Sequence, residues 1–119
     1  MLVSPKTSTI RVASFRDEFQ ESVQVYCTPK GFMEDAVVLN VMSDRAYPSA
    51  KPEVRFDHHP HRDRNVDDLD AAAAFVEAYG YLVDLARWII EQRAEGLGVL
   101  AVEQKIECSL RVTEEQAVA

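Results

Sequence analysis

The run from Asn65 to Glu95 constrains the fold of this 119-residue chain more than any other stretch. Asn65 is a good helix N-cap, because its side-chain oxygen can accept a hydrogen bond from a free backbone amide. Three aspartates in the next five positions suit the positive end of a helix dipole, and the alanines at 71–74 favour helix. Arg93 suits the negative end, and Gly96 is a natural stop. The run predicts one long helix.

The apolar residues of this helix cover more than half of its circumference, at about 100° per residue. An ordinary surface helix needs a narrower apolar face. The helix is therefore expected to bury two sides, one of them on a sheet. The main stripe is Ala72, Phe75, Tyr79, Leu82, Ala86 and Ile89, with Val76, Val83 and Ile90 on one flank and Ala74, Ala78, Tyr81, Leu85 and Trp88 on the other.

Two kinds of neighbour can cover the second side of the helix. One is a loop or terminal segment of the same chain. The other is a second protein chain, for which Tyr81, Leu85 and Trp88 would be the anchors, because aromatic anchors dominate protein interfaces. Both alternatives stay open at the level of sequence.

Alternation of apolar and polar residues predicts strands on both sides of the helix. The third strand is apolar on both faces, which is typical of a strand covered on both sides. We expect an α+β fold, a mostly antiparallel sheet of about five strands in β-β-β-β-α-β order, with one long helix packed across one face. The expected strands are Thr9–Phe15, Ser22–Thr28, Asp35–Met42, Glu53–Asp57 and Val99–Val112.

The last of these strands, Val99–Val112, is unusually long. At about 3.3 Å per residue it would exceed 40 Å, and an overhanging edge could pair with another chain. The length of the chain fits a single domain over residues 1–119, with loose ends at 1–7 and 113–119.

The net charge of −7 is unevenly placed. Residues 1–65 carry nine basic and nine acidic side chains, whereas residues 66–119 carry four basic and eleven acidic. This acidic half disfavours nonspecific contact with nucleic acid and would suit a basic partner. No stretch resembles a signal peptide or a membrane span, so a cytoplasmic protein is expected, with Cys27 and Cys108 as buried, reduced thiols.

The histidines of the chain are concentrated between Arg55 and Arg64. Asp57, His59 and His61 are spaced by two, as in a strand whose side chains share one face, and this spacing raises the possibility of a metal site. Together with Asp63, however, they would span about 20 Å when extended, whereas zinc ligands lie about 2.0 to 2.2 Å from one ion. We therefore expect no metal and no other cofactor.

The same segment can be interpreted as a contact surface. Arg55, Arg62 and Arg64 could contact phosphates, although the segment has no aromatic platform for bases. Alternatively, Arg55, His59, His61 and Arg62 could contact an acidic surface on a protein. The default interpretation is a solvated, pH-sensitive loop before the helix. Of the two contacts, the protein contact is favoured over nucleic acid.

The sequence favours a non-catalytic protein-interaction module over an enzyme, because no glycine-rich phosphate loop or nucleophile motif is present. An adaptor, an inhibitor, an immunity-type protein or a phage or mobile-element accessory protein would fit, and a homodimer is the simplest use of spare apolar surface. The alternatives are an enzyme dependent on a metal or small molecule, built on Asp57, His59 and His61, and a nucleic-acid contact through the three arginines.

Overall fold

A computed structural model describes residues 5, 8–32, 34–47, 50–58 and 69–118, with the side chains of residue 58 and of 112–118 excepted. Four strands are followed by two helices. They are β1 (Ser8–Arg16), β2 (Gln20–Pro29), β3 (Val37–Asp44), β4 (Glu53–His58), α1 (Leu69–Ala94) and α2 (Val99–Val118).

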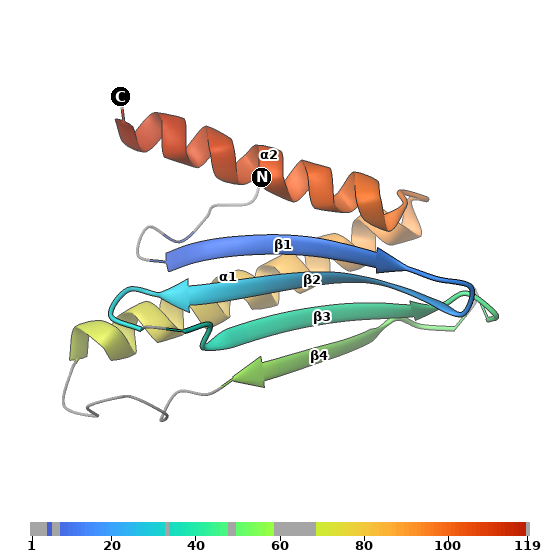
Figure 1. Ribbon diagram of the computed structural model, residues 1–119, viewed down its shortest axis with the longest axis horizontal. Helices are drawn as coiled ribbons and strands as arrows, with labels where there is room; N and C mark the ends of the chain where they lie inside the picture. The colour runs from blue at the N-terminus through green and yellow to red at the C-terminus, as the bar shows by residue number, and fades with distance from the viewer. Residues whose placement is uncertain (1–4, 6–7, 33, 48–49, 59–68, 119) are drawn as a thin grey trace.

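The strands form one antiparallel sheet in the order β1-β2-β3-β4 (Figure 1). The four strands that the sequence predicts before the helix are thereby confirmed. Val12, Val25, Leu39 and Phe56 lie opposite one another across the sheet. This row belongs to the face on which the helices pack, and it fixes the face of every other strand residue because side chains alternate.

The predicted long helix is confirmed as α1, which begins at Leu69 among the described residues. Asn65, the predicted N-cap, lies outside the described residues, as do two of the three aspartates. The inward stripe contains Ala78, Leu82 and Ile89, which have no exposed surface. Burial of this stripe against β2 and β3 holds the helix on the sheet.

As predicted, Gly96 marks the end of α1. Its backbone φ is 99°. The amide of Gly96 donates to the carbonyl of Arg93 at 3.0 Å, and the amide of Leu97 donates to that of Gln92 at 3.1 Å. These two bonds form a Schellman motif, which requires a left-handed residue at the position of Gly96. Leu97 then packs against the core and directs the chain into α2.

The prediction of a fifth strand over Val99–Val112 is wrong, because this segment forms α2. The buried residues Val99, Val102 and Ile106 follow steps of three and four, which is the spacing of one helix face. The amide of Val102 donates to the carbonyl of Gly98 at 3.1 Å and closes the first turn. Residues 113–118, expected as a loose tail, continue the helix.

Two features explain why α2 is a helix although its sequence alternates. Glu103, Gln104, Lys105, Glu107 and Arg111 are all good helix formers. Arg111 and Glu107 also form an ion pair one helical turn apart, at 3.7 Å. As a result, Cys108 points away from the core and is exposed, contrary to the expectation that it is buried, whereas Cys27 is buried as expected.

Both helices lie on the same face of the sheet (Figure 1). α1 packs over β2 and β3, and α2 packs over β1 and β2 beside α1. The sequence suggested that the opposite face is partly covered, since Val38 and Met42 are apolar. No described helix or strand lies over that face, so this suggestion is not met within the part of the chain that the structure describes.

The chain itself covers the second side of α1. Tyr81 is 6% exposed and Leu85 is fully buried, both in the same core cluster as Val102 and Ile106 of α2. Of the two alternatives that the sequence leaves open, the terminal segment of the same chain is the one found. Neither α1 nor α2, over its described residues, has an apolar stretch long enough to span a bilayer.

Candidate protein-interaction site

The face of the sheet opposite the helices is here called the open face. Its side chains come from all four strands and alternate with the core residues. It divides into a polar part and an apolar part along the strands. Its residues are Arg11, Ala13, Phe15, Ser22, Gln24, Tyr26, Val38, Asn40, Met42, Glu53, Arg55 and Asp57.

The polar part of the open face is tied together by its own hydrogen bonds. Arg11 forms an ion pair with Asp35 at 2.5 Å and lies over the ring of Tyr26, with the guanidinium carbon 5.0 Å from the ring centre. The hydroxyl of Thr28 donates to Asp35 at 2.7 Å, and that of Tyr26 donates to Gln24 at 2.5 Å. These groups satisfy one another, so this part of the face offers few free polar groups to a ligand.

The apolar part lies at the end of the sheet where β1 ends and β2 begins. Phe15 is 46% exposed, Phe19 71% and Tyr47 68%. The other aromatic side chains that the structure describes are buried or half-buried. We call Phe15, Phe19 and Tyr47 the aromatic end. Phe15 shares a cross-strand row with Ser22, Met42 and Glu53. Ser22 is only 4% exposed, so that row presents apolar side chains and one carboxylate to solvent.

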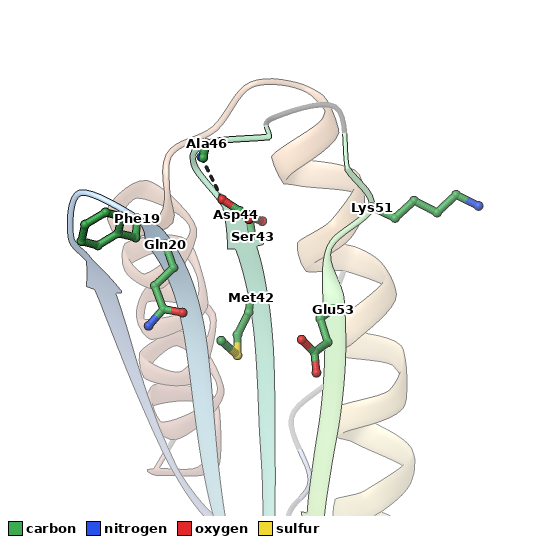
Figure 2. Close-up of a pocket in the computed structure, with 8 residues that line it drawn as sticks. All are labelled: Phe19, Gln20, Met42, Ser43, Asp44, Ala46, Lys51 and Glu53. Atoms are coloured by element: carbon green, nitrogen blue, oxygen red, sulfur yellow. Dashed lines mark hydrogen bonds between the residues drawn. The ribbon is translucent and has the colours of Figure 1, made fainter.

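A hollow of about 440 Å³ lies beside Phe19 (Figure 2). Met42 of β3 and Glu53 of β4 line it from neighbouring strands, and the side chain of Lys51 points away from it. Apolar and charged groups therefore meet at this hollow, as at the edge of many interfaces. The lining residues are Phe19, Gln20, Met42, Ser43, Asp44, Ala46, Lys51 and Glu53.

The turn that carries Phe19 is held by Asp17. The Oδ1 atom of Asp17 accepts hydrogen bonds from the amides of Phe19, at 2.7 Å, and Gln20, at 2.8 Å. The bonds from Gln20 and then Phe19 lower the pKa of the Asp17 carboxyl from its usual 3.8, because they favour the charged form.

The connection between β3 and β4 is fastened to this turn. The amide of Arg45 donates to the carbonyl of Phe19 at 2.9 Å, and its guanidinium donates to the carbonyl of Asp17 at 2.5 Å. The amide of Ala46 donates to the side chain of Asp44 at 2.8 Å (Figure 2). Phe19 and Tyr47 are thus carried by two loops that are bonded to each other, and Phe15 by the adjoining end of β1, which reduces the entropy lost when a partner binds.

A second hollow, of about 470 Å³, lies on the helix side of the same connection. It shares Ser43, Asp44 and Lys51 with the first hollow and is otherwise bounded by the last turns of α1, including Ile90 and Arg93. The connection between β3 and β4 therefore separates two depressions, and only the first opens beside exposed aromatic residues.

The three predicted anchors on α1 do not form a surface. Tyr81 and Leu85 are buried in the core, and Trp88 is half-buried and packs against it. Because the chain already covers these side chains, they have little area to offer to a partner in this conformation. The expectation that they anchor a partner therefore loses its physical basis.

The predicted contact segment before α1 is described only in part. Arg55 is exposed on the open face and forms an ion pair with Glu53 at 2.9 Å. His59, His61 and Arg62 lie outside the described residues, as does Arg64. Among the residues that are described, no three His, Cys, Asp or Glu side chains lie close enough together to hold a metal ion.

Sequence reasoning missed the aromatic end, although two signals were present. Phe15 falls on the same face of β1 as Arg11, where a polar residue is expected. Phe19 stands within the polar connector Arg16–Gln20. Aromatic residues at positions that a buried core cannot use are candidates for contact with another molecule.

No protein-family model, curated protein or solved structure matches this chain. What the site can do must therefore be argued from its own geometry. Exposed aromatic rings on a fixed backbone, beside a depression with charged residues, form a surface suited to binding another macromolecule.

Proposed function

We propose that this protein is a non-catalytic protein-binding module of the adaptor or inhibitor type, whose partner contacts the aromatic end. The single observation that carries the proposal is that Phe15, Phe19 and Tyr47 are all strongly exposed and lie in β1 or in the two connections at one end of the sheet. Exposed aromatic residues are costly in water and are enriched among the residues that dominate binding energy.

The surroundings of the aromatic end support this function. Met42 adds an adaptable apolar contact in the lining of the hollow, and Asp44 and Glu53 supply charge at its rim. The hydrogen bonds from Arg45 hold the two loops together before any partner arrives. We expect a partner that inserts an apolar side chain beside Phe19 and places a basic group near the carboxylates.

Site-specific photocrosslinking tests the proposal. Phe19 is replaced by the photoreactive amino acid p-benzoylphenylalanine in cells that express the chain naturally, and Leu100 is replaced in a matched control. Leu100 is 59% exposed but lies on α2, away from the open face. We expect a discrete adduct from position 19 that position 100 does not give.

The adduct is identified by mass spectrometry, and the affinity of the purified partner is then measured by calorimetry. Phe19→Ser should weaken binding by about thirtyfold or more, since truncating a central aromatic anchor costs at least about 2 kcal/mol in typical interfaces. Leu100→Ser should leave the affinity unchanged. Equal crosslinking from positions 19 and 100 would overturn the proposal.

A further inference from the structure

β4 is an edge strand of the described sheet, and α1 packs mainly over β2 and β3 and contacts β4 through Tyr79 and Phe56. The sheet order leaves one side of β4 without a neighbouring strand among the described residues. Val54 lies in the same row as Val23 and Val41, on the helix side. It is 37% exposed, whereas Val23 and Val41 are 1% and 3% exposed. Within the part of the chain that the structure describes, the outer backbone edge of β4 is therefore open to pairing from outside.

An apolar flank of α1 borders the same edge. Tyr79 packs against Phe56 of β4 with the rings tilted and their centres 5.4 Å apart, so this side of the helix faces β4. Val76 and Val83 lie one turn before and after Tyr79 on that side. Val76 is 68% exposed, and Val83 and Ile90 are half-buried. These three residues recur every seven positions and continue the over-wide apolar face that α2 leaves uncovered.

The charges on β4 alternate in sign. Glu53, Arg55 and Asp57 point to the open face, with Val54 and Phe56 between them on the helix side. Strand edges that avoid pairing often carry charged side chains, lysine especially, which repel an identical edge. A row of alternating charges behaves differently. If a second, antiparallel copy is aligned so that its residue 57 lies opposite residue 55, each arginine faces a carboxylate.

We propose that two copies of this chain pair through β4 about a two-fold axis, so that the two sheets join as one eight-stranded antiparallel sheet. Phe56 lies on the axis and faces its own counterpart. Arg55 of each copy then faces Asp57 of the other, which gives two complementary ion pairs on the open face. The apolar flanks of the two α1 helices come to lie along the same junction.

Other registers fit less well. Pairing centred on Arg55 sets the two arginines against each other and each Glu53 against an Asp57, so all three pairs are like-charged. Pairing centred on Val54 places Pro52 opposite Phe56, and proline has no amide to donate to the ladder. The register centred on Phe56 uses residues 54–58, which all belong to β4.

Charge reversal tests the pairing and its register together. Sedimentation velocity is measured over a concentration series for the wild type, for Arg55→Asp and for Asp57→Arg, with Arg111→Asp as the control. Arg111 is exposed on α2, which packs over β1 and β2, with 72% of its side chain accessible. We expect the wild type to dimerise, each β4 variant to dimerise about tenfold or more weakly, and Arg111→Asp to behave as the wild type.

Mixing the two β4 variants gives the decisive result. One copy then carries two carboxylates at positions 55 and 57 and the other carries two arginines, so a mixed pair is complementary at both positions. We expect dimers to return in the equimolar mixture. A wild type that stays monomeric at its highest soluble concentration overturns the proposal, and so does a mixture in which dimers do not return. Circular dichroism checks that each variant is folded.

This inference does not rest on the proposed function. Phe19→Ser should leave the sedimentation of the protein unchanged, and Arg55→Asp should leave the crosslink from position 19 in place. A dimer weakened by Phe19→Ser and unaffected by Arg55→Asp would assign self-association to the aromatic end and would refute pairing through β4.

Discussion

Glu21, at the start of β2, forms an ion pair with Arg93, in the last turn of α1, and only 17% of each side chain is exposed. The Arg93 guanidinium also donates to the carbonyl of Leu97 at 2.6 Å, just beyond the end of the helix. One side chain thus joins the sheet, the C-terminus of α1 and the turn into α2. This junction lies at the same end of the sheet as the exposed aromatic residues.

Breaking this ion pair should destabilise the fold. Removing one partner leaves the other partly buried without its bond, so Glu21→Gln and Arg93→Met should each lower the free energy of unfolding by about 1 to 3 kcal/mol. A double-mutant cycle in urea should give a coupling energy of about 1 kcal/mol. The control cycle uses Asp84 and Arg87, which are 4.0 Å apart with 72% and 76% of their side chains exposed. It should give about 0 to 0.5 kcal/mol.

Two glycines of similar exposure should respond to alanine in opposite ways. Gly96→Ala should lower the free energy of unfolding by about 1 to 2 kcal/mol, because its left-handed backbone disfavours a Cβ. Gly80 lies within α1, and a Cβ there would meet no atom within 4 Å. Gly80→Ala should therefore raise the free energy by about 0.5 to 1 kcal/mol. Thermal unfolding of both variants measures the difference, and a loss of stability in both would contradict the assignment.

The two cysteines should differ in reactivity. Cys108 is exposed on α2, whereas Cys27 is buried in the sheet, and burial raises the pKa of the Cys27 thiol. Because the thiolate is the reactive form, we expect a thiol reagent at neutral pH to modify one cysteine in the folded protein and two after unfolding. Cys108→Ser should remove the fast reaction, and Cys27→Ser should not. Had 99–112 been the predicted strand, both thiols would be protected.

The predicted anchors of α1 should act on stability. Trp88 is half-buried against the core, so Trp88→Ala should lower the free energy of unfolding by about 2 to 4 kcal/mol. Leu82→Ala, at a fully buried position, should cost about 2 to 5 kcal/mol. Val76→Ala, at a 68% exposed position, should change stability by less than about 0.5 kcal/mol. Weakened association with unchanged stability in Trp88→Ala would return that residue to the binding surface.

The Asp17 carboxyl should titrate below its usual pKa of 3.8 in the folded protein. A folded-state pKa that is lower than the unfolded one adds stability above the unfolded value. That stability is lost as the pH falls through the folded value. NMR chemical shifts of the Asp17 carboxyl, followed from neutral to acid pH, measure its folded-state pKa. Asp17→Ala should remove the part of the stability that is lost at acid pH. A carboxyl that titrates at or above 3.8 would show that the amides of Phe19 and Gln20 do not stabilise its charged form.

Much of the sheet can be predicted from local pattern. The alternation of Val23, Val25 and Cys27 with polar residues assigns the inward face of β2 correctly, because β-branched residues at every second position suit a pleated strand. The Arg93 and Gly96 pair likewise marks the end of α1, because the C-terminus of a helix has local requirements. The candidate site was not foreseen, because exposure of Phe15, Phe19 and Tyr47 depends on which face the helices leave open.

The sequence by itself determined the four strands, the long helix and its end, since these follow from the spacing and chemistry of neighbouring residues. It did not determine α2. Val102, Ile106 and Leu110 are spaced by four, which fits a strand face and a helix face equally, and burial beside α1 selects the helix. Tertiary packing also decided that Tyr81 and Leu85 are core residues and that β4 is an open edge, because contacts between distant segments leave no local pattern.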